Sequence, residues 1–337
     1  MKRKANLVAF ASIVGLAVLA PSWSAVAQTT TLKITGCLPR NHDYIEAFHD
    51  AFITPLNAKG TDLQLRYLGG TEVTPRGKQA PALKRGLIDI IHCPGAYYGG
   101  VLSEARLAGV QNRSLEEIRA NGGWDMMQEA WGKGLNARIL AWVHFKGQKF
   151  YIYTRFKPKL SEKTGLDLTG VKMRSTGLYN ALFKAMGATT IVITPTDVYA
   201  ALQRGVVQGL AWPWGSVAKL GWEGFLEYRV EPSFYGASML MLINRDKYNS
   251  LSQSQKDLLN SQARIFEETS DDIIIRKGII DDARIKKAGV KRLILKGKVR
   301  KAYLATIYGA KWADNDKRKY IVDYKKLKAK LYAEPDS

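Results

Sequence analysis

Two hydrophobic periodicities alternate along the chain. Apolar and polar residues alternate singly over 29–37 and 61–70, as in half-buried strands, and 87–93 is mostly apolar, as in a strand buried on both faces. Between these runs, apolar residues recur at helical spacing over 42–60 and 75–86. The order strand, helix, strand, helix, strand predicts an α/β fold with a parallel sheet.

The same order returns in the second half of the chain. Strands are predicted over 168–175, 188–194 and 206–212, with helices over 177–187 and 195–205 between them. We therefore expect two α/β lobes of similar construction rather than one continuous sheet. A ligand cleft is expected between the lobes, because clefts between domains are frequent binding sites.

The segments between and after these units indicate where the lobes meet. Two strand-like runs, 135–145 and 149–155, flank a predicted turn, and a long helix with an apolar stripe is predicted over 252–278. We expect the chain to return to its first lobe after building the second. The expected boundaries are 28–147 and 234–282 for lobe I, and 148–233 and 283–337 for lobe II.

The N-terminal segment has the pattern of a secretory signal. A basic head and an apolar run of about fifteen residues precede an Ala25-Val26-Ala27 site. The apolar run is shorter than the roughly 20 residues that span a bilayer. We therefore expect residues 1–27 to be cleaved near Ala27, leaving a soluble mature chain that starts at about Gln28 and lies outside the cytoplasm.

The chain is strongly basic, with a formal net charge of +21. Lys2, Arg3 and Lys4 lie in the predicted signal, so 21 − 3 leaves +18 for the mature chain. Such a charge suits anionic ligands, nucleic acid or an anionic surface. Nucleic acid is disfavoured by the expected location and by the lack of a matching motif, and the lysines over 311–337 fit the exposed face of a terminal helix.

The two cysteines, Cys37 and Cys93, occupy equivalent places in the pattern. Each follows a predicted strand and precedes a turn-rich segment. If the strands are neighbours in a parallel sheet, both sulfur atoms lie at the same edge. In an oxidising compartment the pair is then either a disulfide or two free buried thiols, and the sequence leaves both possibilities open.

Motifs of catalysis and metal binding are missing from the sequence. The chain has no nucleophile elbow, zinc-protease helix, Cys-x-x-Cys pair or phosphate-binding loop. Its four histidines lack the spacing of paired metal ligands. The sequence therefore predicts a protein that is not an enzyme, carries no cofactor and has no identifiable metal ligands, and it leaves open whether a metal ion binds together with a ligand.

Arg174 is the charged residue with the most suggestive position. It ends a short apolar strand and precedes Ser175, Thr176 and Gly177, so we expect its guanidinium at the edge where a parallel sheet presents ligands. The planar fork of arginine suits a carboxylate held through two parallel hydrogen bonds. A surface salt bridge explains the pattern equally well.

Residues 168–213, LTGVKMRSTGLYNALFKAMGATTIVITPTDVYAALQRGVVQGLAWP, resemble the signature region of the solute-binding proteins of TRAP transporters, the tripartite ATP-independent periplasmic family. Weaker similarity covers 68–73, 83–90 and 241–259, whereas 103–145 matches poorly. The resemblance implies a two-lobed, periplasmic-binding-protein-like α/β fold, in which each lobe is a mainly parallel sheet flanked by helices. It also implies that the protein captures a small organic acid and delivers it to the membrane subunits of a TRAP permease driven by an ion gradient. We expect a monomer.

The resemblance further implies roles for single residues. Arg174 occupies the position of the family's Lys-x-Arg arginine, which clamps the ligand carboxylate, and Lys149 lies where a second basic residue often occurs. Many members carry an asparagine that contacts the carboxylate where this chain has Trp212. The ligand must therefore be held differently on that side.

Aromatic residues near these positions bear on the body of the ligand. Trp214 and Trp222 follow Trp212, and Tyr97 and Tyr98 lie in a turn-rich segment of the first lobe. They predict an aromatic-walled pocket for a monocarboxylate with an apolar or aromatic body; alternatively, the tryptophans only pack the lobe. The remaining candidate ligand-binding residues are His42 and Glu72.

Two functions of other classes compete with the binding-protein interpretation. The positive charge alone indicates a polyanion- or envelope-surface-binding protein. A periplasmic enzyme acting on carboxylates is the other alternative, but the sequence supplies no assembled catalytic base.

Overall fold

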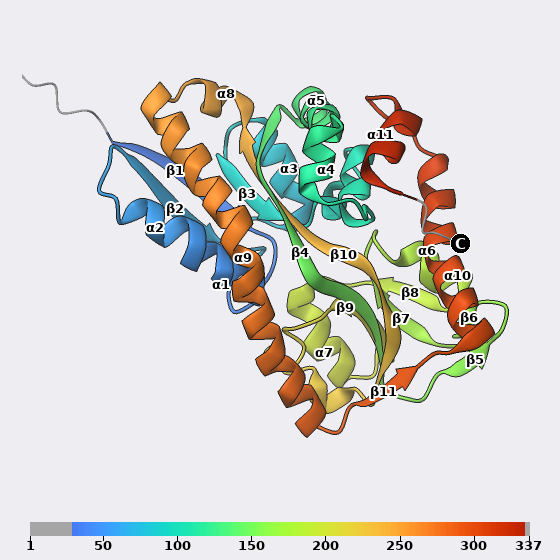
Figure 1. Cartoon of the computed structure of the whole chain (residues 1–337). Coiled ribbons are helices and arrows are strands. Elements are labelled where there is room, and N and C mark those ends of the chain that lie inside the picture. Colours follow the sequence, from blue (N-terminus) through green and yellow to red (C-terminus); the bar gives the residue numbers. More distant parts are fainter. Residues whose placement is uncertain (1–28, 334–337) are drawn as a thin grey trace, which may run out of the picture.

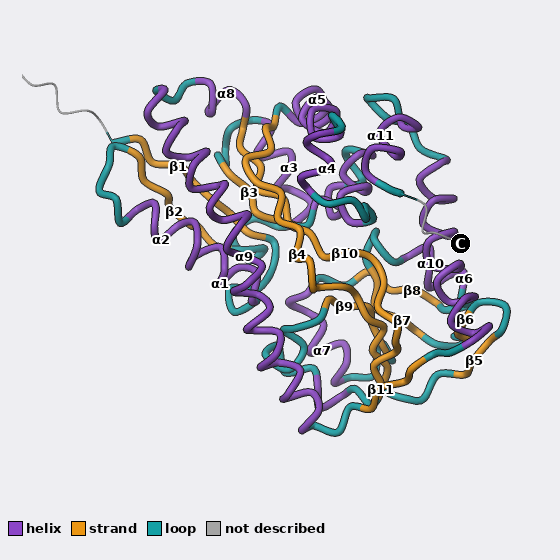
Figure 2. Tube along the Cα trace, viewed as in Figure 1, coloured by secondary structure: helices purple, strands orange, loops and turns teal. Residues whose placement is uncertain are grey.

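A mixed sheet forms the centre of the computed structural model, which describes residues 29–333. The nine strands follow the order β2-β1-β3-β10-β4-β9-β7-β8, with β11 beside β10. Figures 1 and 2 show the sheet running through two lobes, with helices packed around it. The two-lobed α/β class is confirmed, whereas the predicted signal over 1–27 lies outside the described residues.

The first half of the chain forms the parallel strands that its pattern predicts. β1 (Thr30–Gly36) pairs in parallel with β2 (Leu63–Gly69) and with β3 (Ile90–Cys93). Strands and helices alternate here because the apolar period changes from two to about 3.6 and back. The intervening helices are α1 (Asp43–Phe48), η1 (His49–Ile53), α2 (Thr54–Asn57) and α3 (Arg76–Lys84).

The second half repeats this construction. β7 (Lys172–Ser175) pairs in parallel with β8 (Thr189–Val192) and β9 (Gly209–Pro213). Its parallel order places the end of β7, and therefore Arg174, at the edge of the sheet that the sequence predicts. The helices of this unit are α6 (Asn180–Ala185), η4 (Pro195–Asp197) and α7 (Val198–Gln203).

Two long antiparallel strands connect the halves. β4 (Ala137–Thr154) and β10 (Tyr228–Asn244) pair along most of their lengths, and Figure 1 shows both running from one lobe to the other. The prediction of two strands with a turn between 135–145 and 149–155 is wrong, because this segment is one strand that bends instead of reversing. Register shifts between Phe234 and Ser238 provide the bend. One sheet therefore extends through both lobes, although the pairing of β4 with β10 is interrupted between His144 and Lys149, and the sheet is mixed rather than mainly parallel.

Long helices line two sides of the molecule. α9 (Gln253–Lys287) has 35 residues and begins with a capping box in which Ser252 and Gln255 bond each other's backbone. At 1.5 Å per residue it is about 52 Å long, enough to pass both lobes, as Figure 1 shows. On the opposite side, α10 (Gly297–Asp316) packs on α6, and α11 (Tyr324–Leu331) packs on α5 (Gly123–Leu135).

The chain therefore returns to its first half twice, through α9 and through α11. The domain boundaries given above remain a prediction. Within the described residues, no helix combines the length and apolar character needed to cross a membrane. The remaining elements are η2 (Gly95–Tyr98), η3 (Ser103–Gly109), α4 (Leu115–Ala120), β5 (Lys159–Ser161), β6 (Gly165–Asp167), η5 (Glu223–Phe225), α8 (Arg245–Asn249) and β11 (Lys291–Ile294).

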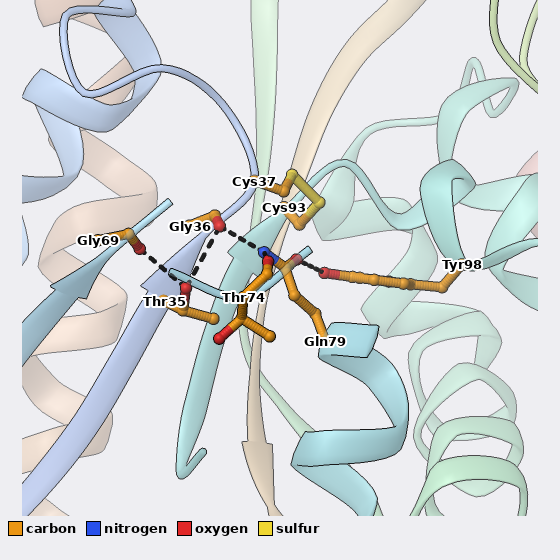
Figure 3. Close-up of a disulfide and its surroundings, with 8 residues drawn as sticks. All are labelled: Thr35, Gly36, Cys37, Gly69, Thr74, Gln79, Cys93 and Tyr98. Carbon is orange, nitrogen blue, oxygen red and sulfur yellow. Dashed lines mark hydrogen bonds between the residues drawn. A yellow bond between two sulfur atoms is a disulfide. The ribbon is translucent and has the colours of Figure 1, made fainter. Parts of the chain in front are cut away.

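A disulfide joins the ends of β1 and β3. Cys37 directly follows β1, Cys93 is the last residue of the adjacent parallel strand β3, and their Cα atoms are 5.4 Å apart. Figure 3 shows the bond beside Gln79, whose amide donates to the carbonyl of Gly36 (2.6 Å). Of the two possibilities that the sequence leaves open, the structure has the disulfide. It ties together the two loops that carry residues 38–44 and 94–97.

Candidate ligand-binding cavity

A small cavity lies between the two halves, where the loops after β1 and β3 face the loop after β7 and the end of β9. Its free space is about 30 Å³, room for about two water molecules, so an organic ligand would fit only after the two halves had moved apart. No acidic side chain lines it among the described residues. The residues that matter most for its chemistry are His42, Tyr44 and Tyr97 from the first half, and Phe150, Tyr179 and Trp212 from the second.

Arg174 lies behind this lining and is fully buried, with 0% of its surface exposed. Its Nε donates to the carbonyl of Ile193 (3.0 Å), and its guanidinium carbon lies 5.4 Å from the ring centre of Trp212. Neither Nη1 nor Nη2 has a hydrogen-bond partner of normal geometry within residues 29–333. A buried cation without a counter-ion costs several kcal/mol. The site therefore favours an anion beside the guanidinium.

Tyr179 is the neighbouring residue that the sequence did not single out. Burial raises the pKa of Tyr179 to about 12, although the positive charge of Arg174 acts in the opposite direction. The phenol is therefore uncharged at neutral pH and offers no counter-ion. Its place five residues after Arg174, at the end of the same turn, is the signal that could have identified it.

His42 presents an imidazole to the cavity from the opposite half. The residue is 1% exposed, and it caps α1 because its Nδ1 accepts a hydrogen bond from the backbone N–H of Tyr44 (3.1 Å). Burial lowers the pKa of His42 to about 4, although neighbouring Asp43 raises it. The ring is therefore neutral at pH 7. Its Nε2 has no partner in the described part of the chain.

Trp212 lies near both the imidazole of His42 and the guanidinium of Arg174. It lies in β9, is 2% exposed, and has its ring centre 5.6 Å from that of His42 and 4.7 Å from that of Trp222. Trp212 therefore packs the second half and lines the cavity at once, so the two alternatives for it are not exclusive. Tyr97 is half-buried at the opposite wall, with the guanidinium of Arg76 over its ring at 4.8 Å.

The structure places four sequence candidates outside this cavity. Lys149 is exposed in a separate groove, since it precedes Phe150 in β4 and successive side chains of a strand point to opposite faces. The hydroxyl of Tyr98 donates to Gln79 (2.8 Å) in the core beside the disulfide (Figure 3). Trp214 Nε1 donates to Asp282 of α9 (3.2 Å), and exposed Glu72 accepts from the backbone of its own turn.

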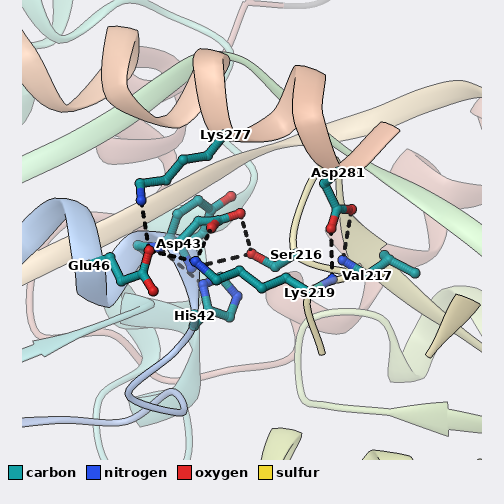
Figure 4. Close-up of polar contacts among 9 residues, drawn as sticks. His42, Asp43, Glu46, Ser216, Val217, Lys219, Lys277 and Asp281 are labelled. Carbon is teal, nitrogen blue, oxygen red and sulfur yellow. Dashed lines mark hydrogen bonds and ion pairs between the residues drawn. The ribbon is translucent and has the colours of Figure 1, made fainter. Parts of the chain in front are cut away.

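Beside the cavity, α1 contacts the segment that follows β9. Asp43 accepts hydrogen bonds from Ser216 Oγ (2.7 Å) and from Lys219 Nζ (3.1 Å), and its side chain is 5% exposed. Lys219 Nζ also pairs with Glu46 Oε2 at 2.5 Å. Figure 4 shows these residues converging from the two halves of the chain. We call Asp43, Ser216 and Lys219 the inter-lobe contact.

Helix α9 supports the inter-lobe contact from the side. Lys277 Nζ pairs with Glu46 at 2.7 Å, and Asp281 accepts from the backbone N–H groups of Val217 (3.0 Å) and Lys219 (2.9 Å). Burial raises the pKa of Asp281 to about 6. The segment after β9 is thereby held against both α1 and α9 (Figure 4).

The donor set of the cavity suits an organic anion better than a metal ion. Over the described residues, no group of three or more His, Cys, Asp or Glu side chains is arranged to hold a metal. The polar atoms without partners are instead donors or uncharged groups: Arg174 Nη1 and Nη2, His42 Nε2 and Trp212 Nε1. What they require is a ligand with hydrogen-bond acceptors and negative charge.

Comparison with known proteins agrees with this geometry. Residues 61–306 match the family model of bacterial extracellular solute-binding protein, family 7. A TRAP transporter solute-binding protein from Bordetella bronchiseptica, with copurified calcium and picolinate, has a TM-score of 0.78 at 18% identity over 90% of this chain and 92% of its own. One from Ralstonia eutropha with bound (S)-2-acetolactate has a TM-score of 0.75 at 14% identity over 89% and 97%.

A further similar structure is an extracytoplasmic solute receptor from Bordetella pertussis that binds pyroglutamic acid. Its TM-score is 0.73 at 14% identity, over 90% of this chain and 99% of its own. At these identities the likeness establishes the fold, and the family match rests on the sequence model. The correspondence covers both lobes.

Proposed function

The chain belongs to family 7 of the bacterial extracellular solute-binding proteins, the DctP family of TRAP transporters, and we propose that it captures a small monocarboxylate with an apolar or aromatic body. It is a solute-binding protein and not an enzyme. We further propose that the mature chain starts near Gln28, acts in the periplasm as a monomer and delivers its ligand to the membrane subunits of a TRAP permease.

One observation carries this proposal: a fully buried arginine lacks a counter-ion. Arg174 has two terminal nitrogens without partners, and no acidic residue lines the adjoining cavity among the described residues. A ligand carboxylate would supply the missing charge and accept both N–H groups through a bidentate pair. The binding energy is then concentrated on a single anionic group.

The surroundings of Arg174 support a ligand with one carboxylate and little other polarity. Lys149, the candidate for a second cation, lies in a separate groove, so a second carboxylate would have no partner in the cavity. Aromatic rings of Tyr97, Phe150 and Trp212 form much of the wall. The similar proteins described above carry picolinate, 2-acetolactate and pyroglutamic acid, each with one carboxyl group, whereas a similar protein from Rhodoferax ferrireducens carries malonate, which has two.

Thermal unfolding tests the proposal directly. The mature protein, freed of copurified ligand by unfolding and refolding, is mixed with a panel of aliphatic and aromatic mono- and dicarboxylates. A ligand at a hundredfold excess over its dissociation constant stabilises the folded state by about 2.7 kcal/mol, which raises Tm by several degrees. We expect this rise with small monocarboxylates and not with dicarboxylates of similar length.

Substitution of the arginine identifies the site. Arg174→Met should lose the ligand-induced rise in Tm, because breaking a desolvated charge pair costs roughly 2–5 kcal/mol. Lys172→Met is the matched control, since Lys172 lies on the same strand two residues earlier and is exposed. A panel in which no carboxylate raises Tm would refute the function, and equal rises in the Arg174→Met and control variants would refute the site.

A further inference from the structure

The hydrogen-bonding of His42 determines which of its nitrogens carries the proton. Its Nδ1 accepts from the backbone N–H of Tyr44 at 3.1 Å, and a backbone N–H can only donate. Nδ1 therefore carries no hydrogen. In a neutral imidazole the hydrogen must then be on Nε2. His42 is locked as the tautomer whose free nitrogen is a donor.

This donor has nothing to bind in the protein. Nε2 is buried, lacks a hydrogen-bond partner among residues 29–333, and belongs to a side chain that lines the cavity. An unsatisfied buried donor is unfavourable by about the free energy of desolvating it. The ring cannot turn over to relieve this, because that would remove the cap from α1. The missing acceptor is expected from whatever fills the cavity.

We propose that His42 selects the second functional group of the ligand, by donating from Nε2 to an uncharged acceptor that neighbours the carboxylate held by Arg174. A keto oxygen or a ring nitrogen meets this requirement. This inference rests on the proposed function, since it assumes that a carboxylate occupies the same cavity. Under this proposal, Arg174 on β7 in the second half binds the carboxylate, and His42 at the start of α1 in the first half binds the acceptor.

The same argument ranks chemically matched ligands. A methylene or aromatic C–H in place of the acceptor leaves the His42 donor unsatisfied. An ammonium group there would add a second proton donor and a positive charge, and no carboxylate lines the cavity to receive them. We therefore expect acceptor-bearing acids to bind most tightly. Analogues with a methylene or an aromatic C–H in place of the acceptor should bind less tightly, and the corresponding amino acids least tightly.

Paired ligands provide the test. Dissociation constants are measured by calorimetry at pH 7.5 for picolinate against benzoate, and for 2-oxo-3-methylbutanoate against 3-methylbutanoate. The acceptor-bearing member of each pair that binds should bind about tenfold or more tightly, the effect of one satisfied against one unsatisfied buried donor. Equal affinity within the pairs for the unaltered protein would overturn the inference, while binding of neither member of any pair would point to failure of the proposed function itself.

A variant then assigns the preference to His42. In His42→Asn the side-chain oxygen can still cap α1, because asparagine is a favourable N-cap residue, but the shorter side chain lacks the donor at the Nε2 position. We expect the preference within each pair to fall to within about twofold of unity. His49→Asn, in the adjoining η1 and outside the cavity lining, should keep it. An undiminished preference in folded His42→Asn protein would also overturn the inference, and an equal weakening of both ligands would show that the role of His42 is only structural.

Discussion

The inter-lobe contact should increase ligand affinity although it does not touch the ligand. Lys219 comes from the segment after β9 and reaches the carboxylates of Asp43 and Glu46 on α1. These atoms meet only when the two halves are close together, as they are around the present small cavity. If the lobes separate to admit and release ligand, the contact forms on closure. Its free energy then adds to the free energy of ligand binding.

The size of the effect of Lys219→Met on Kd follows from the hydrogen-bond partners that Glu46 and Asp43 would keep in the variant. Glu46 keeps its ion pair with Lys277 at 2.7 Å and is 27% exposed, so losing its bond to Lys219 costs little free energy. Asp43 is 5% exposed and, within residues 29–333, keeps Ser216 as its one side-chain hydrogen-bond donor at 2.7 Å. Burial acts to lower the pKa of Lys219, but its bonds to Glu46 and Asp43 outweigh this and raise it. One charge-assisted bond to a buried carboxylate contributes about 2 kcal/mol, which corresponds to about 30-fold in Kd.

The assay compares Lys219→Met with Lys277→Met. The control removes a lysine of nearly equal exposure, 26% against 27%, that also binds Glu46 but joins α9 to α1 without reaching Asp43. Calorimetry with one ligand gives Kd, and rapid dilution gives the dissociation rate. We expect Lys219→Met to weaken binding about 30-fold, mainly through faster dissociation, and Lys277→Met to change it less than threefold. Equal affinities of the two variants would refute the reasoning.

Two further predictions concern stability. Because the Cys37–Cys93 disulfide closes a loop of 56 residues, replacing both cysteines by alanine should lower the free energy of unfolding in guanidinium chloride by about 4 kcal/mol; a change under about 1 kcal/mol would contradict this chain-entropy argument. Burial lowers the pKa of His92 from 6.5 to about 3, so below pH 6.5 the unfolded chain binds the extra proton and stability falls as pH decreases. By pH 4.5 the loss should be roughly 2–3 kcal/mol more than in His92→Phe, and parallel pH profiles of the two proteins would contradict it.

Much of the fold could be predicted from the sequence because its signals are local. The change from alternating to helical spacing places β1, α1 and β2 correctly, and the helical pattern that begins at 252 places the start of α9. The interruption of β4 was wrongly predicted, since the glycine-containing turn pattern over 146–148 reads the same in a reversing chain and in a bent strand. Only the pairing with β10, more than 80 residues away, decides between them.

The site was predictable to a lesser extent, because burial and pairing are properties of the whole fold. The pattern placed Arg174 at a sheet edge, but whether its guanidinium meets an acidic partner depends on segments far away in the sequence. Lys149 is an example. Its neighbour Phe150 lines the cavity, and because successive side chains of a strand point to opposite faces, Lys149 points away from it. Tyr179 escaped notice because its approach to Arg174 is set by a turn rather than by a periodicity.

The strong positive charge of the chain and the buried Arg174 have separate roles in this arrangement. Exposed charges act through solvent over about 8–10 Å at physiological ionic strength, so they can attract anions but cannot distinguish between them. Arg174 is removed from solvent and acts only on a group in contact with it, where geometry matters. His42 is buried as well, but its pKa of about 4 leaves it neutral at pH 7. It would therefore contribute a directional hydrogen bond without adding charge. We therefore expect affinity for a carboxylate to depend on Arg174, and discrimination among carboxylates to depend on the uncharged groups around it.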